Sequence, residues 1–241
     1  MSIRATIATA GRVAGQLRHD RRTLALLLAV PVLLVTIMRY VFADGDTFDR
    51  IGGPLLGIFP LISMFLVTSI AMLRERTSGT LERLLSMPVG KLDILLGYAL
   101  AFAAFAVVQA VLVASVSFGL LGLEVEGSVW TVMLLAIANA VLGMALGLFV
   151  SAFARTEFQA VQFLPAFLLP QLLLCGLLAP RDSMAPVLET VSRVLPMTYA
   201  YEALDRVTNG SGDAAGPVAV VVGCALLALA AGAATLRRTS A

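Results

Sequence analysis

Charged residues are scarce in this sequence, and apolar residues are abundant. Charged residues make up 13% of the 241 residues, whereas apolar residues make up 59%. A soluble globular domain has about 25% charged and about 45–50% apolar residues. We therefore expect a chain whose surface faces lipid, because apolar side chains need no partner there. The net charge of +2 says little about partners, and we expect no nucleic-acid partner for such a membrane chain.

Residues that carry metal, nucleophilic or phosphate chemistry are also few. Cys175 and Cys224 lie in apolar runs without CxxC spacing, which argues against a disulfide framework or a zinc site. His19 is the one histidine, and no partner for catalysis stands near it in sequence. The one lysine, Lys91, lacks the glycine and hydroxyl neighbours of a phosphate-binding loop. We expect no enzyme activity, cofactor or metal in this chain.

Long apolar runs recur along the chain. About 20 apolar residues cross a hydrocarbon core that is about 30 Å thick, at about 1.5 Å per residue. The first run is too long for the apolar part of a signal peptide, and no cleavage site follows it. We predict an all-α membrane protein of one domain, residues 1–241, with spans at 23–42, 51–73, 94–120, 129–154, 158–179 and 217–236.

The distribution of basic residues predicts the orientation. With both termini in the cytoplasm, the inner segments hold twelve lysine and arginine residues. The outer segments then hold five, namely Arg39, Arg50, Arg181, Arg193 and Arg206. Because basic residues stay on the cytoplasmic side, we predict a multi-pass protein of the cell membrane with both ends inside.

Two inner segments have amphipathic patterns. Residues 3–19 place apolar residues on one helical stripe, which predicts a basic helix on the inner membrane surface; the alternative is a frayed, soluble terminus. In the loop 74–93, Gly79 breaks the chain, a leucine face follows it, and Pro88 ends it. This pattern predicts a short helix across the cytoplasmic surface, although a charged loop without structure is an equal alternative.

The outer segment 180–216 is too polar to span the membrane. It contains Pro180, Pro186 and Pro196, and its apolar residues recur at helical spacing. We expect short helices or a re-entrant hairpin against the outer leaflet. Backbone at that depth must be shielded by protein or water.

The spans contain amides but almost no ionisable residues. Ion-coupled carriers usually have intramembrane acids or histidines, so their absence argues against that class. Gln109, Gln162 and Gln171 either line a substrate path or bond neighbouring helices, and we favour the second reading. Small and polar residues recur every four positions on the fourth span, which predicts a packing ridge of Asn139, Gly143, Gly147 and Ser151.

Two segments of the chain resemble the type-2 ABC exporter permeases, a family that includes bacterial drug-resistance and polysaccharide permeases. Residues 75–97 have the family's inner-loop pattern of an acidic residue, Gly-Thr-x-Glu, a proline and Leu-Gly. The six spans and the amphipathic N-terminal helix match as well. The family's outer-loop motif is matched in this sequence by Pro170, Gly176, Pro180, Met184, Pro186, Pro196, Thr198, Tyr199 and Arg206.

The resemblance implies how such a chain works. Two permease halves, identical or related, pair around a path, and each docks on a separate cytoplasmic ATPase that binds ATP and magnesium. The outer segment closes the path. The implied substrate is a drug, lipid or other amphipathic compound, as in multidrug efflux and antibiotic resistance. The ATPase contact is carried by Glu75, Gly79, Thr80, Leu81, Glu82, Arg83, Leu84, Leu85 and Pro88.

Without the resemblance, a passive channel or a membrane assembly scaffold remains an alternative. A membrane-embedded enzyme is disfavoured because no catalytic set is present. A neighbouring gene that encodes an ATPase with a phosphate-binding loop would favour the exporter. The sequence fixes neither the substrate nor the identity of the second half.

Overall fold

The computed structural model describes residues 2–42, 45–86 and 90–235, and within these ranges the chain is helical with no strand. Six helical segments are long and apolar enough to cross a membrane. The predicted all-α class with six apolar helices is therefore confirmed. The elements are α1 (Ile3–His19), α2 (Arg21–Val41), α3 (Gly45–Thr77), α4 (Thr80–Ser86), α5 (Lys91–Gly119), α6 (Val129–Val150), α7 (Glu157–Phe163), η1 (Leu164–Leu168), α8 (Leu169–Leu174), η2 (Arg181–Ser183), α9 (Pro186–Ser192), α10 (Pro196–Thr208) and α11 (Ala215–Ala234).

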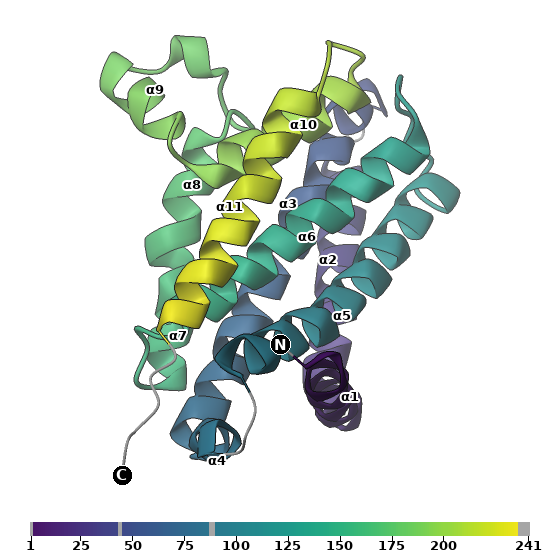
Figure 1. Cartoon of the computed structure of the whole chain (residues 1–241). Coiled ribbons are helices and arrows are strands. Elements are labelled where there is room, and N and C mark those ends of the chain that lie inside the picture. Colours follow the sequence, from purple (N-terminus) through teal and green to yellow (C-terminus); the bar gives the residue numbers. More distant parts are fainter. Residues whose placement is uncertain (1, 43–44, 87–89, 236–241) are drawn as a thin grey trace.

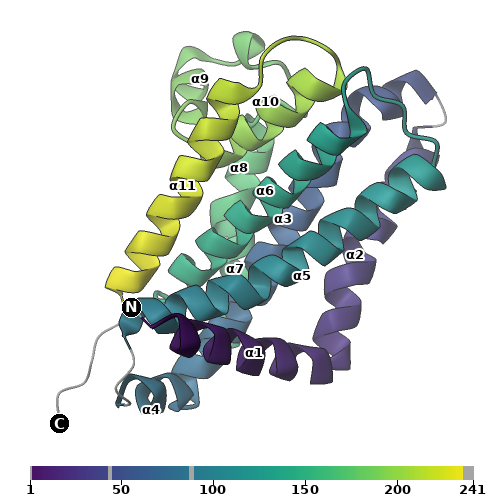
Figure 2. The same cartoon turned by 45° about the vertical axis from the view of Figure 1, so that its right-hand side comes forward.

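The long helices run side by side between two ends of the molecule (Figure 1). One end, called here the α4 end, carries α1 and α4 and the turn into α7. The opposite α10 end carries α9 and α10. Figure 2 shows α1 lying across the α4 end, with α2 rising from near its end. The chain thus places both amphipathic inner segments of the sequence at one end and the outer segment at the other.

The centre of the bundle is the contact between α3 and α6. A Cβ added at Gly143 would lie 2.1 Å from the main-chain oxygen of Leu61, and one at Gly147 would lie 2.1 Å from Thr68 Oγ1. Thr68 Oγ1 also donates across to the carbonyl of Met144 at 3.3 Å. The helices can approach this closely only because the ridge side chains are small. The other predicted ridge residues are buried too, namely Asn139 and Ser151.

The fifth apolar segment, Glu157–Leu174, is a broken helix. The π turn of η1 ends two residues before Pro170, and a proline cannot donate the ordinary helical hydrogen bond. The helix ends at Leu174 and does not reach the expected residue 179. The cause is Gly176, whose φ of 106° takes the chain out of helical geometry.

Two other boundaries differ from the sequence-based expectation. The second apolar helix covers Gly45–Thr77, beyond the expected 51–73 at both ends, because polar turns still satisfy helical hydrogen bonds outside the apolar run. The fourth ends at Val150, short of the expected residue 154, where the chain turns toward α7. Apolar content therefore locates a span but does not set where its helix stops.

Gln109 joins three helices at the middle of the bundle. Its Nε2 donates to the carbonyl of Leu27 on α2 and, at 2.7 Å, to Ser63 Oγ on α3. The side chain is fully buried. An amide that bonds two neighbouring helices in an apolar interior stabilises their contact by about 0.5–2 kcal/mol.

The other amides do not converge with Gln109 on a common path. Asn139 Nδ2 donates to the carbonyl of Ala200 at 3.0 Å, and Gln171 Oε1 accepts from the Met197 N–H at 3.4 Å. Both bonds anchor α10 to the apolar helices. Gln162 is exposed and lines a shallow hollow near the turn between α6 and α7. Within this chain the predicted path-lining set is therefore dispersed, and its buried members bond helices.

Candidate ATPase-coupling site

The turn between α3 and α4 is set by Gly79. Its φ of +73° lies in the left-handed region, which costs other residues about 1–2 kcal/mol. The Ser78 N–H closes α3 on the carbonyl of Arg74 at 2.9 Å, and Ser78 Oγ lies 3.0 Å from Thr80 Oγ1 at the start of α4. The glycine therefore fixes the angle at which α4 leaves α3.

Helix α4 has a buried face and an exposed face. Leu81 is only 5% exposed and packs in a cluster with residues of α1 and α5, and Leu84 packs partly against the same cluster. Glu82 and Arg83 are exposed. The resemblance assigns Leu81 to the ATPase contact, but in the structure its own chain covers this side chain. The remaining predicted contacts, the Leu85 side chain and Pro88, lie outside the described residues.

Glu75 is committed to contacts within the chain. Its Oε1 pairs with Arg12 Nη1 on α1 at 3.2 Å. Arg12 also donates to the hydroxyl of Tyr98 on α5, and its guanidinium lies 5.5 Å from the centre of the Tyr98 ring. Partial burial opposes the charge on Arg12, but Tyr98 and Glu75 outweigh it and raise the pKa of the guanidinium. The cluster ties α1, α3 and α5 together beside α4.

Arg74 makes a second junction at the end of α3. It forms a two-pronged pair with Glu157 at the start of α7, with distances of 2.7 and 3.0 Å. It also lies 3.9 Å from Asp20, between α1 and α2. Asp20 caps α2 by accepting from the hydroxyl and N–H of Thr23, and these bonds lower the pKa of the Asp20 carboxyl.

Helix α1 lies directly against the start of α5. A Cβ added at Gly97 would lie 2.5 Å from the Thr9 Cβ, so only glycine permits this approach. The Asp93 carboxylate accepts from the Ser2 N–H at 3.1 Å and holds the beginning of α1. The predicted apolar stripe divides: its later part is buried against α5, whereas Ile3 and Ile7 are 76% and 59% exposed.

The predicted outer residues organise the α10 end. Pro180 and Met184 flank η2, Pro186 opens α9 and Pro196 opens α10. A proline suits the first turn of a helix because its missing N–H has no helical partner there. The outer segment is thus built of short helices, and their starts are set by the prolines.

Hydrogen bonds join α9 to α10. Thr198 Oγ1 and the Tyr199 hydroxyl each donate at 2.7 Å, to the carbonyls of Ser192 and Arg193. Arg206 pairs with Glu202 of its own helix, and the same carboxylate pairs with Arg181 of η2 at 3.0 Å. These bonds hold the short helices of the outer segment to one another.

The family of the chain follows from comparison with known proteins. Residues 6–207 match the family model described as ABC-2 type transporter. The chain belongs to the ABC-2 type transporter family. Together with the six long apolar helices, this makes it a multi-pass membrane protein. The resemblance noted on the inner-loop and outer motifs is confirmed.

Individual relatives come from bacteria and from a eukaryote. The chain is 26% identical to the ABC transporter G family member 20 of Dictyostelium discoideum over 76% of its own length and 25% of that protein. It is 29% identical to the probable multidrug ABC transporter permease YbhS of Escherichia coli over 58% and 37% of the two lengths. It is 30% identical to the inner membrane transport permease YhhJ of Escherichia coli over 61% and 40%. The matched parts are less than half the length of these relatives.

Proposed function

We propose that this chain is the transmembrane permease of an ATP-driven exporter, and that α4 is its contact with a separate ATPase that binds ATP and magnesium. The observation that carries this proposal is the geometry of α4. Gly79 sets its angle, buried Leu81 holds it to the bundle, and Glu82 and Arg83 point away from the chain. Exposed charges of opposite sign on an anchored helix determine the position and orientation in which a partner protein binds.

The α4 end is then the cytoplasmic end in the cell membrane. The support is the bias of basic residues, twelve on the segments predicted to be cytoplasmic against five on the segments predicted to be outside. The beginning of α1 and the end of α11 lie at the same end (Figure 1). Both termini are cytoplasmic in this proposal.

Transport follows from movement of α4 with the helix that carries it. Closure of the ATPase pair displaces α4, and α3 moves with it as a rigid body, which switches access between the two faces. A second permease half, a copy or a relative, completes the path, and the outer segment closes its far side. The proposed substrate is a drug, lipid or other amphipathic compound, in keeping with the name of the multidrug relative.

A charge reversal on α4 tests the ATPase contact. Glu82→Lys replaces an exposed carboxylate without touching the bundle, so the protein should still reach the membrane. We expect co-purification with the partner ATPase to fall about tenfold, which is about 1.4 kcal/mol, and export to fall with it. Pull-down of the tagged permease measures the association.

The matched control is Asp182→Lys, which reverses an exposed charge at the opposite end. It should leave the association unchanged. Undiminished co-purification of the Glu82→Lys variant would overturn the role given to α4. Loss of association in both variants would show that the effect is not specific to this end.

A further inference from the structure

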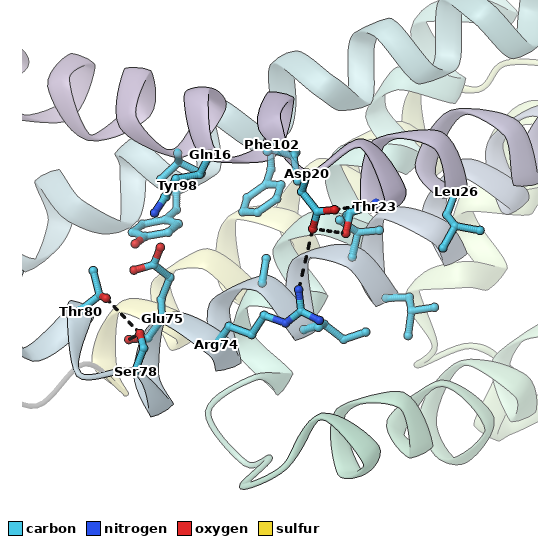
Figure 3. A pocket seen from close by; sticks show the side chains of 16 residues that line it. Gln16, Asp20, Thr23, Leu26, Arg74, Glu75, Ser78, Thr80, Tyr98 and Phe102 are labelled. Atoms are coloured by element: carbon cyan, nitrogen blue, oxygen red, sulfur yellow. Dashed lines mark hydrogen bonds and ion pairs between the residues drawn. The ribbon is translucent and has the colours of Figure 1, made fainter.

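A cavity of about 500 Å³ lies between the α1–α2 elbow and the end of α3. Figure 3 shows its lining: Glu75, Ser78, Thr80 and Tyr98 gather at one end, Asp20 and Arg74 face each other in the middle, and Leu26 lies at the other end. Its volume is in the range of sites that hold small molecules. All the residues that line the cavity come from one chain, so a second permease half is not needed to form it.

The charged wall of the cavity is net negative. Among the described residues that line it, Asp20 and Glu75 are carboxylates, and Arg74 is the cation. The charge of Arg74 is already engaged by Glu157 at 2.7 and 3.0 Å, and its distance to Asp20 is 3.9 Å. Glu75 shares one oxygen with Arg12, while its other oxygen, Oε2, is buried without a hydrogen-bond partner. Because Arg12 balances the charge of Glu75 and Glu157 balances that of Arg74, Asp20 leaves the wall with one net negative charge, which favours a cation.

The other part of the cavity is apolar and follows the membrane helices. Leu66, Val67 and Ile70 line it from α3, and Leu26 lines it from α2. Leu66 and Arg74 are eight residues apart, which is about 12 Å along a helix. Leu26 is 62% exposed on the outside of the bundle, so the apolar part reaches the lipid-facing surface.

We propose that this cavity binds an amphiphile with a cationic ammonium head, the head between Asp20 and Glu75 and the alkyl chain along Leu66, Val67 and Ile70. A membrane aminophospholipid and a soluble alkylammonium compound share this chemistry. A charge in a partly buried site interacts far more strongly than it would in water, so the head group decides the selectivity. The cavity shares Glu75 and Thr80 with the residues assigned to the ATPase contact, but binding to the purified chain can be measured without the ATPase, so the two proposals can fail separately.

Photolabelling of the purified chain in phosphatidylcholine nanodiscs tests the site. The probe is a dodecylammonium carrying a diazirine, and dodecanoate with the same photoreactive group is the anionic counterpart. We expect the ammonium probe to label peptides of α1–α2 and α3 around the cavity and the anionic probe to label them about tenfold less. Equal labelling by both probes would overturn the proposal.

Variants separate the site from general membrane labelling. Asp20→Asn keeps an oxygen that can cap α2, and Ala71→Phe fills the cavity, so each should lower ammonium labelling about tenfold. Asp182→Asn removes an exposed carboxylate that lies outside the cavity, at the opposite end of the molecule, and should leave the labelling unchanged. Labelling that survives both Asp20→Asn and Ala71→Phe would refute the site.

Competition identifies the source of the ligand. Addition of phosphatidylethanolamine to the nanodiscs displaces the probe if a membrane lipid occupies the site. If only soluble alkylammonium compounds displace it, the site takes those compounds. Dodecanol has the same alkyl chain but no charge. If dodecanol displaces the probe while neither phosphatidylethanolamine nor soluble alkylammonium compounds do, the head group is irrelevant and the proposal is contradicted.

Discussion

At the scale of single residues, the small side chains on α6 determine how closely the central helices pack. Gly143→Ala would place a Cβ 2.1 Å from the Leu61 carbonyl oxygen, a main-chain atom that cannot rotate away. We expect a loss of about 1–3 kcal/mol of stability from overpacking. The thermal midpoint of the purified protein in detergent micelles measures it.

Gly223→Ala on α11 is the control, since nothing lies within 4 Å of its added Cβ. That change should be neutral or stabilise the helix by about 0.5–1 kcal/mol. Equal midpoints for the Gly143→Ala and Gly223→Ala variants would contradict the close contact between α3 and α6.

Asp20 gives a dependence on pH at the same scale. Its pKa is lowered from the ordinary value of 3.8 by bonds from Thr23, so its capping contribution is complete above about pH 3.8. That contribution is lost as the pH falls through the lower pKa of the folded state. We expect the stability difference between the wild type and Asp20→Asn to shrink on acidification toward pH 3, measured by thermal unfolding. A difference that grows in this range would contradict the assignment.

At the scale of elements, α1 depends on one close approach to α5. Gly97→Leu would drive a side chain into Thr9, so we expect α1 to separate from the bundle while the six long helices remain. Protease sensitivity of residues 3–19 in vesicles should rise severalfold. Gly11→Leu, on a part of α1 with open space around it, is the control and should leave the digestion pattern unchanged.

The elements were largely predictable because each one is encoded locally. Apolar runs, proline and glycine act within a few residues, so the six spans, the α4 turn at Gly79 and the short outer helices follow from the sequence. The ion pairs at the α4 end were not predictable. Arg12–Glu75 and Arg74–Glu157 join residues 63 and 83 positions apart, and no spacing rule connects them. The burial of Leu81 was not predictable either, since an apolar side chain on α4 fits its own bundle as well as a partner.

At the scale of the whole molecule, the orientation in the membrane is the decisive test. We expect a reporter inserted in the loop 74–93 to be active on the cytoplasmic side, and one inserted at residues 124–127 to be active outside, because basic residues gather at the α4 end. Paired alkaline phosphatase and fluorescent protein fusions measure this. An external loop 74–93 would contradict the proposed ATPase contact.

The junction at Arg74 has a consequence for how force spreads through the molecule. The Arg74 guanidinium donates two hydrogen bonds to Glu157 at the start of the fifth apolar segment. It also lies near Asp20 between α1 and α2. A bidentate pair between an arginine and a carboxylate fixes the relative orientation of the two segments that it joins. A displacement of the C-terminal end of α3 is therefore transmitted to segments that are distant in the sequence. The broken helix that follows Glu157 contains the weaker π turn, and we expect the resulting bend to occur there.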